Sequence, residues 1–98
     1  MPHFVLSYRA NEMPHNRYGL VASRRIGNAV QRNKVRRRLR EALYNFHPKI
    51  GQQYLLDTSD VEGFDLILIA RQSITKATFQ ELVQQLSDAL QRAELMEI

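Results

Sequence analysis

The sequence of 98 residues predicts an α/β fold in which a small mixed sheet packs against two helices. Three short segments, at 3–9, 17–23 and 64–70, are rich in aromatic, β-branched or other apolar residues, which is typical of strands. Two longer segments, at 28–46 and 78–90, repeat apolar residues at helical spacing. No internal repeat or low-complexity segment interrupts them, so we expect a single domain over residues 1–98.

The first half of the chain contains two predicted strands and one helix. The polar stretch "ANEMPHN" separates "HFVLSYR" at 3–9 from the segment at 17–23, and we interpret the two segments as an antiparallel pair. Gly27 breaks the strand pattern, and Asn28 can accept hydrogen bonds from the free N–H groups of a first helical turn. The predicted helix therefore begins at Asn28 and runs to about Phe46, before a His-Pro pair ends it.

The second half predicts a strand followed by a helix. "FDLILIA" at 64–70 is almost continuously apolar, which favours a strand that is covered on both faces. "TFQE" at 78–81 matches a capping box that opens the C-terminal helix. The stretch from Lys49 to Gly63 is mostly polar and acidic, and it predicts no clear element. The residues that we expect the C-terminal helix to bury are Phe79, Leu82, Val83, Leu86 and Leu90.

The composition excludes several classes of protein. The chain has no cysteine, so it contains no disulfide, no thiolate metal site and no cysteine nucleophile, as suits an intracellular protein. The longest apolar run, Leu66 to Ala70, is too short to span a bilayer, and the N-terminus lacks the order of a signal peptide. We therefore expect a soluble, cytoplasmic protein with no membrane partner.

Positive charge is concentrated in one segment. Residues 1–49 hold 11 Lys and Arg against two acidic residues, whereas residues 50–98 hold three against eight. Eight of the 14 cations lie between Arg24 and Arg40. A polyanion is the partner that such a local concentration of charge predicts.

The predicted helix at 28–46 presents these cations around a narrow apolar stripe. Arg32, Arg36 and Arg40 follow one border of the stripe, and Lys34 and Arg38 lie on the opposite flank. Like charges four residues apart repel by ~0.2–0.5 kcal/mol per pair in isolated helices. A charged run is often only a solvated face, but arginine binds phosphate with a planar two-pronged donor set, so nucleic-acid binding is favoured here. The stripe consists of Val35, Leu39, Ala42, Leu43 and Phe46.

The stretch "SRRIGNAVQRNKVRRRLREAL" at 23–43 closely resembles the signature of the protein subunit of bacterial ribonuclease P. "HFVLSYR" is similar to the second strand of that family, "FDLILIAR" to its last strand, and "TFQELVQQLSDAL" to its last helix. The resemblance implies an α+β two-layer sandwich of the ribosomal protein S5 domain 2-like type.

In that family the RNA carries the active site, and the resemblance implies that the protein is a non-catalytic subunit of the holoenzyme. It would bind the catalytic RNA, contact the 5′ leader of precursor tRNA during endonucleolytic removal of that leader, and raise the affinity for magnesium. Magnesium would be held mainly by RNA and substrate, and none tightly by the protein alone. Matched by position, the implied RNA contacts are Arg24, Arg25, Asn28, Arg32, Asn33, Lys34, Arg36, Arg37 and Arg40.

The N-terminus departs from the family pattern. The family has a short helix and a strand before the segment that matches "HFVLSYR", whereas here Met1 comes almost directly before it. We therefore expect a sheet without that helix and first strand, with an edge that either recruits a second copy or is solvated or covered by residues 49–63. Ser7 occupies the position of a family aromatic. The neighbouring Tyr8 is either a leader contact or an ordinary sheet aromatic.

Other functions fit the sequence less well. A metal-dependent nuclease needs convergent carboxylates, and the acidic residues Asp57, Asp60, Glu62 and Asp65 are only loosely spaced along the chain. His3, His15 and His47 have no metal-ligand spacing, and no Gly-rich phosphate loop or Ser/His/Asp set is present. The remaining alternative is another basic nucleic-acid-binding domain, for example a ribosome-associated one, without a role in tRNA maturation.

Overall fold

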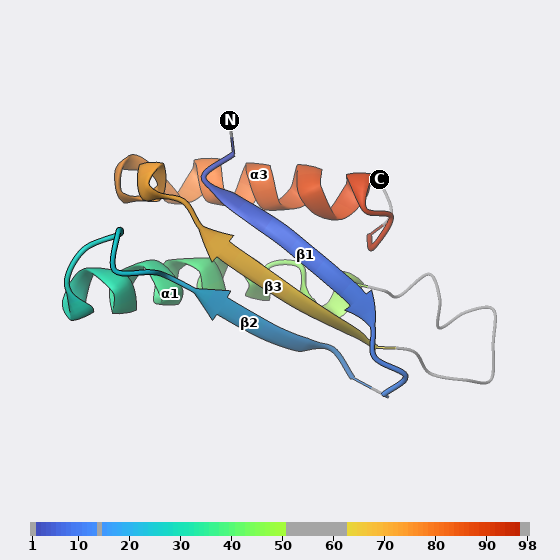
Figure 1. The fold of residues 1–98 in the computed structure, drawn as a ribbon. Coiled ribbons are helices and arrows are strands. Elements are labelled where there is room, and N and C mark those ends of the chain that lie inside the picture. Colours follow the sequence, from blue (N-terminus) through green and yellow to red (C-terminus); the bar gives the residue numbers. More distant parts are fainter. Residues whose placement is uncertain (1, 14, 51–62, 97–98) are drawn as a thin grey trace.

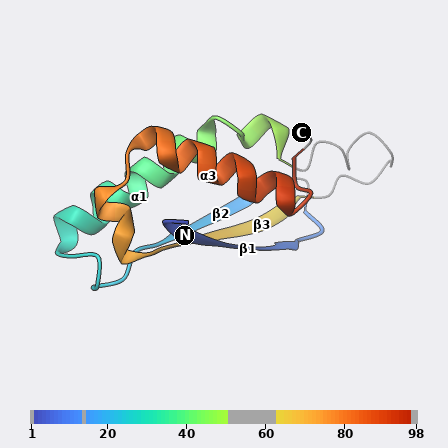
Figure 2. The same cartoon turned by 90° about the horizontal axis from the view of Figure 1, so that it is seen from above.

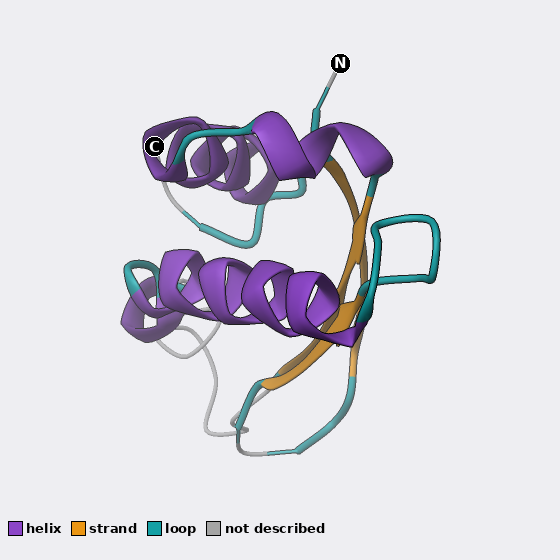
Figure 3. Cartoon of the chain, turned by 90° about the vertical axis from the view of Figure 1, so that its left-hand side faces the viewer, coloured by secondary structure: helices purple, strands orange, loops and turns teal. Residues whose placement is uncertain are grey.

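The computed structural model describes residues 2–13, 15–50 and 63–96, and it has two layers. Both helices lie on the same face of a three-stranded sheet (Figure 2), where they run side by side (Figure 3). This arrangement confirms the predicted α/β fold. Along the chain (Figure 1), the elements are β1 (Phe4–Ala10), β2 (Arg17–Val21), α1 (Ala29–Tyr44), a 3₁₀ turn (His47–Lys49), β3 (Phe64–Ala70), a second 3₁₀ turn (Gln72–Lys76) and α3 (Phe79–Arg92).

The strand order is β1-β3-β2, so the predicted antiparallel pair of β1 and β2 is wrong. β3 lies between them, antiparallel to β1 and parallel to β2. Tyr8 of β1 and Tyr18 of β2 therefore both flank Leu66 of β3. The most apolar strand takes the central position, where its backbone groups are paired on both sides. The connection between Ala10 and Arg17 is long enough to cross the ~10 Å that separates the two outer strands.

Among the residues that the structure describes, β3 is covered on one face only, which corrects the prediction that this strand is covered on both. Its side chains alternate: Leu66 and Leu68 are buried beneath the helices, whereas Ile67 and Ile69 on the other face are 41% and 42% exposed. The run is continuously apolar because its outer face is also apolar, and no described element lies over that face (Figure 2).

Both predicted helices form, and both begin at the predicted caps. The side chain of Asn28 caps α1 and that of Thr78 caps α3, each within a reciprocal capping box.

Each helix buries one apolar stripe against the sheet. The buried residues of α1 are Val35, Leu39, Ala42 and Leu43, whereas Phe46 is half-buried. The buried residues of α3 are Leu82, Leu86 and Leu90. Val83 is half-buried. Phe79, which we expected to be buried, is 39% exposed because it is the first residue of α3, at the N-terminal end of the apolar stripe.

The connection between β1 and β2 is fixed by two asparagines and a glycine. The Asn11 side chain caps the backbone N–H of Met13 at 2.8 Å, and the Asn16 side chain accepts from the backbone N–H of Phe64 at 2.8 Å. A Cβ on Gly63 would lie 2.0 Å from the carbonyl oxygen of His15, so only glycine fits this close approach. In the unassigned stretch, Lys49 closes a 3₁₀ turn and Ile50 is buried, and residues 51–62 lie outside the described part of the chain.

Candidate nucleic-acid interface

A short turn joins β2 to α1 and carries two of the predicted contact residues. Arg24 and Arg25 lie in this turn with exposed side chains. The backbone N–H of Ile26 donates to the carbonyl of Ser23 at 3.0 Å, and that of Gly27 donates to the carbonyl of Arg24 at 3.2 Å. The side chain of Ile26 is buried in the core. The two arginines are therefore presented on an anchored turn directly before the helix.

Gly27 and Asn28 set the direction in which α1 begins. Gly27 has a φ of 146°, and a Cβ there would lie 1.8 Å from Oε1 of Gln31. Oδ1 of Asn28 accepts from the backbone N–H of Gln31 at 2.9 Å, and Oε1 of Gln31 accepts from the backbone N–H of Asn28 at 2.8 Å. The cap thus occupies the side-chain oxygen of Asn28. Its side-chain amide nitrogen has no partner among the described residues and can still donate to a ligand.

The exposed arc of α1 carries a band of positive charge. We call this set the basic band; it consists of Arg32, Lys34, Arg36, Arg37 and Arg40, with Asn33 in its midst. Arg32 and Arg36 are half-buried along the apolar stripe and the other members are exposed. In the described part of the chain no cation of α1 forms an ion pair, and the first turn of α1 contains no acidic residue. The band therefore offers several unneutralised donors to an anion.

Two arginines of α1 are also tied to the fold. Nη1 of Arg36 donates to Oδ1 of Asn33 at 3.0 Å, and its Nη2 donates to the backbone carbonyl of Ala22 at 3.4 Å. Arg38, on the opposite flank of the stripe, donates to the backbone carbonyl of Ala77 in the connection before α3. Arg36 is thus held in place within the basic band, whereas Arg38 links the two helical segments.

A groove lies between β2 and the C-terminal half of α1, beside the basic band. It has a volume of ≈ 330 Å³ and is lined by Tyr18, Leu20, Arg36, Arg40, Leu43 and Tyr44. Neither tyrosine of this groove is among the contacts predicted from the sequence. Tyr44 could have been found from its spacing, because it follows Arg36 and Arg40 at intervals of four residues and must lie on the same side of the helix.

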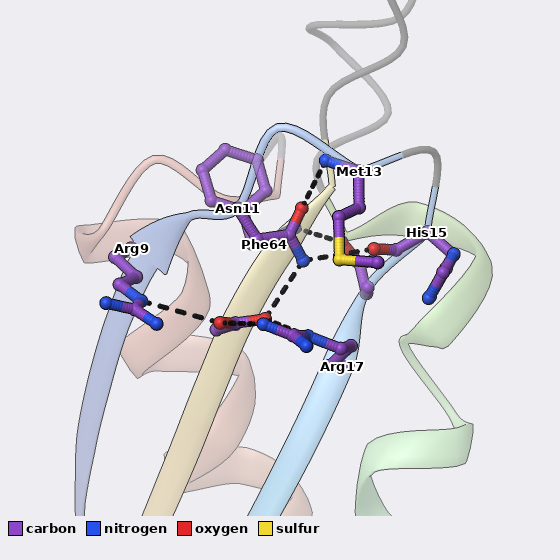
Figure 4. Close-up of polar contacts among 8 residues, drawn as sticks. Arg9, Asn11, Met13, His15, Arg17 and Phe64 are labelled. Atoms are coloured by element: carbon purple, nitrogen blue, oxygen red, sulfur yellow. Dashed lines mark hydrogen bonds and ion pairs between the residues drawn. The ribbon is translucent and has the colours of Figure 1, made fainter.

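On the opposite face of the sheet, four polar side chains meet at one end of the strands. Nε and Nη2 of Arg17 on β2 each donate to one carboxylate oxygen of Asp65 on β3, both at 2.7 Å. Asn11 donates to the same carboxylate at 2.9 Å and Arg9 of β1 at 3.4 Å. Figure 4 shows the side chains of Arg9, Asn11 and Arg17 converging on this point. Asp65 therefore joins all three strands.

The donors around Asp65 keep it ionised. The hydrogen bonds from Arg17 and then Asn11 hold the pKa of the Asp65 carboxyl well below its usual range. The same contact with Asp65 raises the pKa of Arg17. Because the carboxylate already accepts from three side chains, we assign Asp65 a structural role and not that of a free metal ligand.

Tyr8, the candidate leader contact, lies on the edge strand β1 and is 47% exposed. It lines a smaller groove of ≈ 140 Å³ together with Ser7, Arg9, Asp65 and Ile67. Tyr8 is thus accessible to a ligand that approaches the open edge of the sheet.

The acidic and histidine candidates do not form a cluster in the described structure. Asp57, Asp60 and Glu62 lie outside the described residues, and within the described ranges no group of three His, Cys, Asp or Glu residues could hold a metal ion. His3 contacts Ser73 at 2.9 Å and Glu81 at 3.1 Å, which attaches the start of β1 to the region of α3. His47 lies 2.5 Å from the hydroxyl of Tyr18. Neither α1 nor α3, the two α-helices of the described ranges, has the length and apolar character that a membrane span requires.

Comparison with known proteins agrees with the resemblance found in the sequence. The family model described as ribonuclease P matches residues 1–94. The ribonuclease P protein component of Streptococcus thermophilus is 36% identical over 92 residues, which cover 94% of this chain and 73% of the relative. That of Erythrobacter litoralis is 40% identical over 92 residues, covering 94% of this chain and 69% of the relative.

Solved structures show the same fold. The ribonuclease P protein of Staphylococcus aureus superimposes with a TM-score of 0.74 at 30% identity and covers 96% of this chain and 77% of its own. The ribonuclease P protein of Thermotoga maritima gives a TM-score of 0.72 at 29% identity, and the match covers 91% of this chain and 76% of the Thermotoga maritima chain. The family match, the identities and the shared fold together show that this chain belongs to the ribonuclease P protein component family.

Proposed function

We propose that this chain is the protein subunit of a ribonuclease P holoenzyme. In this role it binds the catalytic RNA through α1 and the turn before it, and assists endonucleolytic removal of the 5′ leader from precursor tRNA. The single observation that carries the proposal is the basic band, whose cations form no ion pair in the described chain. The anchored turn directly before α1 adds two more exposed arginines. Such a surface is stabilised by a polyanion that spreads phosphates along it.

The predicted RNA contacts differ in how firmly the fold holds their side chains. Arg36 is oriented by Asn33 and the carbonyl of Ala22, so less freedom is lost when it binds a phosphate. Arg32, Lys34, Arg37 and Arg40 are free to adapt to the RNA backbone. We expect the phosphate contacts to supply most of the affinity, because arginine and lysine release counterions when they bind a nucleic acid.

We propose that the substrate leader contacts the uncovered face of the sheet and its β1 edge. That face presents Val5, Val21, Ile67 and Ile69, all partly exposed. Tyr8 pairs with the buried Leu66, so its side chain lies on the helix side of β1, and a ligand reaches it around the open edge, next to the groove of ≈ 140 Å³. Apolar and aromatic side chains suit an unpaired RNA strand, whose bases can pack on them. Arg9 and Arg17 would add positive charge there, reduced by their shared partner Asp65.

The described residues do not fit a magnesium site of the protein's own. Magnesium prefers oxygen ligands in near-octahedral geometry, and Asp65, the described carboxylate of the uncovered sheet face, is already bonded to Arg17, Asn11 and Arg9. We therefore propose that magnesium in the holoenzyme is held mainly by RNA and substrate and supplies the chemistry of phosphodiester hydrolysis there. The basic residues of this chain would favour magnesium indirectly, by holding the RNA and the precursor together.

The sheet edge supports a further proposal about partners. No described strand pairs with the outer side of β1, and open edges tend to recruit another strand, so we propose self-association through β1. Sedimentation at increasing protein concentration tests this, with Ser7→Lys as a variant whose charge should oppose pairing at the edge. A wild-type chain that stays monomeric throughout contradicts it.

Reconstitution tests the main proposal. The purified chain is added to a bacterial ribonuclease P RNA at a magnesium concentration too low for the RNA alone, and 5′ maturation of a precursor tRNA is measured. We expect cleavage by the complex and none by the protein alone. Filter binding compares the affinity of the chain for ribonuclease P RNA, ribosomal RNA and duplex DNA. Equal affinity for all three, without any stimulation of cleavage, would contradict the proposal. Metal-dependent cleavage by the protein alone, abolished by Asp65→Ala, would also contradict it.

A further inference from the structure

The groove between β2 and α1 combines aromatic, apolar and cationic groups in one small space. Two phenol rings, of Tyr18 and Tyr44, lie in its lining with Leu20 and Leu43, and the guanidinium groups of Arg36 and Arg40 complete it. Its volume of ≈ 330 Å³ is at the lower end of the range for small-molecule sites. The groove therefore suits a ligand that has both a flat ring and a negative charge.

Parts of the lining are held in place before any ligand arrives. The hydroxyl of Tyr18 lies 2.5 Å from Nδ1 of His47, and the two rings meet edge to face with centroids 5.5 Å apart. Arg36 is fixed by Asn33 and by the carbonyl of Ala22. Ordered groups of this kind lower the entropic cost of binding.

Tyr44, in contrast, is not held by a hydrogen bond to any described residue. Its side chain is large and aromatic, yet it is 63% exposed. A helix gains little from an exposed aromatic ring of this size, whereas such a ring is the usual platform for an unpaired base. Arg40 is also exposed, one turn before Tyr44, and forms no ion pair with any described residue.

We propose that this groove binds a single unpaired nucleotide of RNA, with its base stacked on Tyr44 and its phosphate held by Arg36 and Arg40. The inference rests on the proposed function, since the groove lies at the border of the basic band, and it extends that function by adding recognition of an unstacked base to phosphate contact. The half-buried Leu20 contacts the edge of the base, and the buried Leu43 forms the floor of the groove. Stacking accepts any base, so the groove selects unpaired nucleotides over duplex and not one sequence over another.

The first experiment separates stacking from charge by the salt dependence of affinity for ribonuclease P RNA. Tyr44→Ala should weaken binding by roughly 5- to 150-fold, the range found when a stacking aromatic is truncated, with the slope of log affinity against log salt unchanged. Tyr44→Phe is the matched control and should bind as the wild type does. Arg40→Gln should weaken binding and also flatten the slope by about 1.

These outcomes distinguish the inference from the proposed function. A wild-type chain that does not bind the RNA overturns both. A wild-type chain that binds, together with a Tyr44→Ala variant of equal affinity, overturns the groove alone. Because Tyr44 is largely exposed, Tyr44→Ala should unfold at the wild-type temperature, and thermal unfolding checks that lost affinity is not lost folding.

A second experiment needs no ribonuclease P RNA. The chain contains no tryptophan, so Tyr44→Trp introduces a single fluorescent reporter into the groove. A six-nucleotide single-stranded RNA should quench its fluorescence, and the same RNA annealed to its complement should quench it much less. Gln84→Trp, on the exposed side of α3, is the control and should respond little to either. Equal quenching of the Tyr44→Trp variant by single strand and duplex would overturn the inference.

Discussion

The guanidinium of Arg17 and the carboxylate of Asp65 form a two-pronged pair, with Nε and Nη2 each 2.7 Å from one carboxylate oxygen. The pair joins β2 to β3 at the point where Arg9 of β1 reaches the same carboxylate. Bidentate pairs of this geometry are among the stronger charge-assisted hydrogen bonds, and the Asp65 side chain is only 16% exposed. The contact fixes the relative position of all three strands.

Asp65→Asn should therefore destabilise the fold, by an amount that depends on pH. The pKa of Asp65 is lowered in the folded protein, so its contribution is fully present above the unfolded pKa of about 3.9 and is lost as the pH falls through the lower folded pKa. Urea unfolding at pH 7 and at decreasing pH below 4 measures this. The difference between wild type and variant should shrink with acidity. Asp88→Asn, on the exposed side of α3, is the control. If the difference in stability between wild type and Asp65→Asn is constant with pH, the ionised carboxylate of Asp65 does not stabilise the fold.

Loss of one cation from the basic band should weaken RNA binding without affecting the fold. Arg32→Ala and Arg37→Ala remove donors that form no hydrogen bond in the described chain, so each should flatten the salt dependence of RNA affinity by about 1. Filter binding at several salt concentrations measures the slope. Arg92→Ala, at the end of α3, should leave it unchanged. If the band variants unfold while the affinity of the folded fraction is normal, the band is structural.

Truncation of a side chain in the apolar stripe of α1 should instead lower the stability of the fold. Leu39 is fully buried, and Leu39→Ala should lower the free energy of unfolding by ~2–5 kcal/mol. Phe79→Ala removes a larger side chain, but one that is 39% exposed, and it should cost less than Leu39→Ala. Thermal or urea unfolding ranks the two variants, and the opposite order would contradict the packing described for α1 and α3.

Two glycines provide a paired test of close backbone approach. A Cβ at Gly63 would lie 2.0 Å from the backbone carbonyl of His15, whereas one at Gly19 would meet Cγ1 of Ile67 at an ordinary 3.5 Å. Gly63→Ala should therefore cost ~1–3 kcal/mol of stability, the usual range for overpacking, and Gly19→Ala should be nearly neutral. Equal unfolding midpoints for the two variants would show that the connection between β1 and β2 can shift without cost.

The helices, their caps and the basic face of α1 follow from the sequence alone. Asn28 and Thr78 mark the helix starts because each cap bonds only to residues within its own first turn. The stripe around Leu39 and the cations beside it follow from helical geometry alone, as does the likeness of residues 23–43 to a known family. These features depend on neighbours along the chain, so they can be found without the fold.

The strand order, the uncovered face of β3 and the groove depend instead on how distant segments pack together. β3 pairs with two strands that precede it by more than 40 residues, and which strand becomes central depends on how the whole apolar surface is buried. Tyr18 meets Tyr44 in one groove, and Arg17 meets Asp65 across 48 residues, because β2 and β3 lie side by side in the sheet. Such contacts are made by distant segments whose pairing local sequence patterns do not specify.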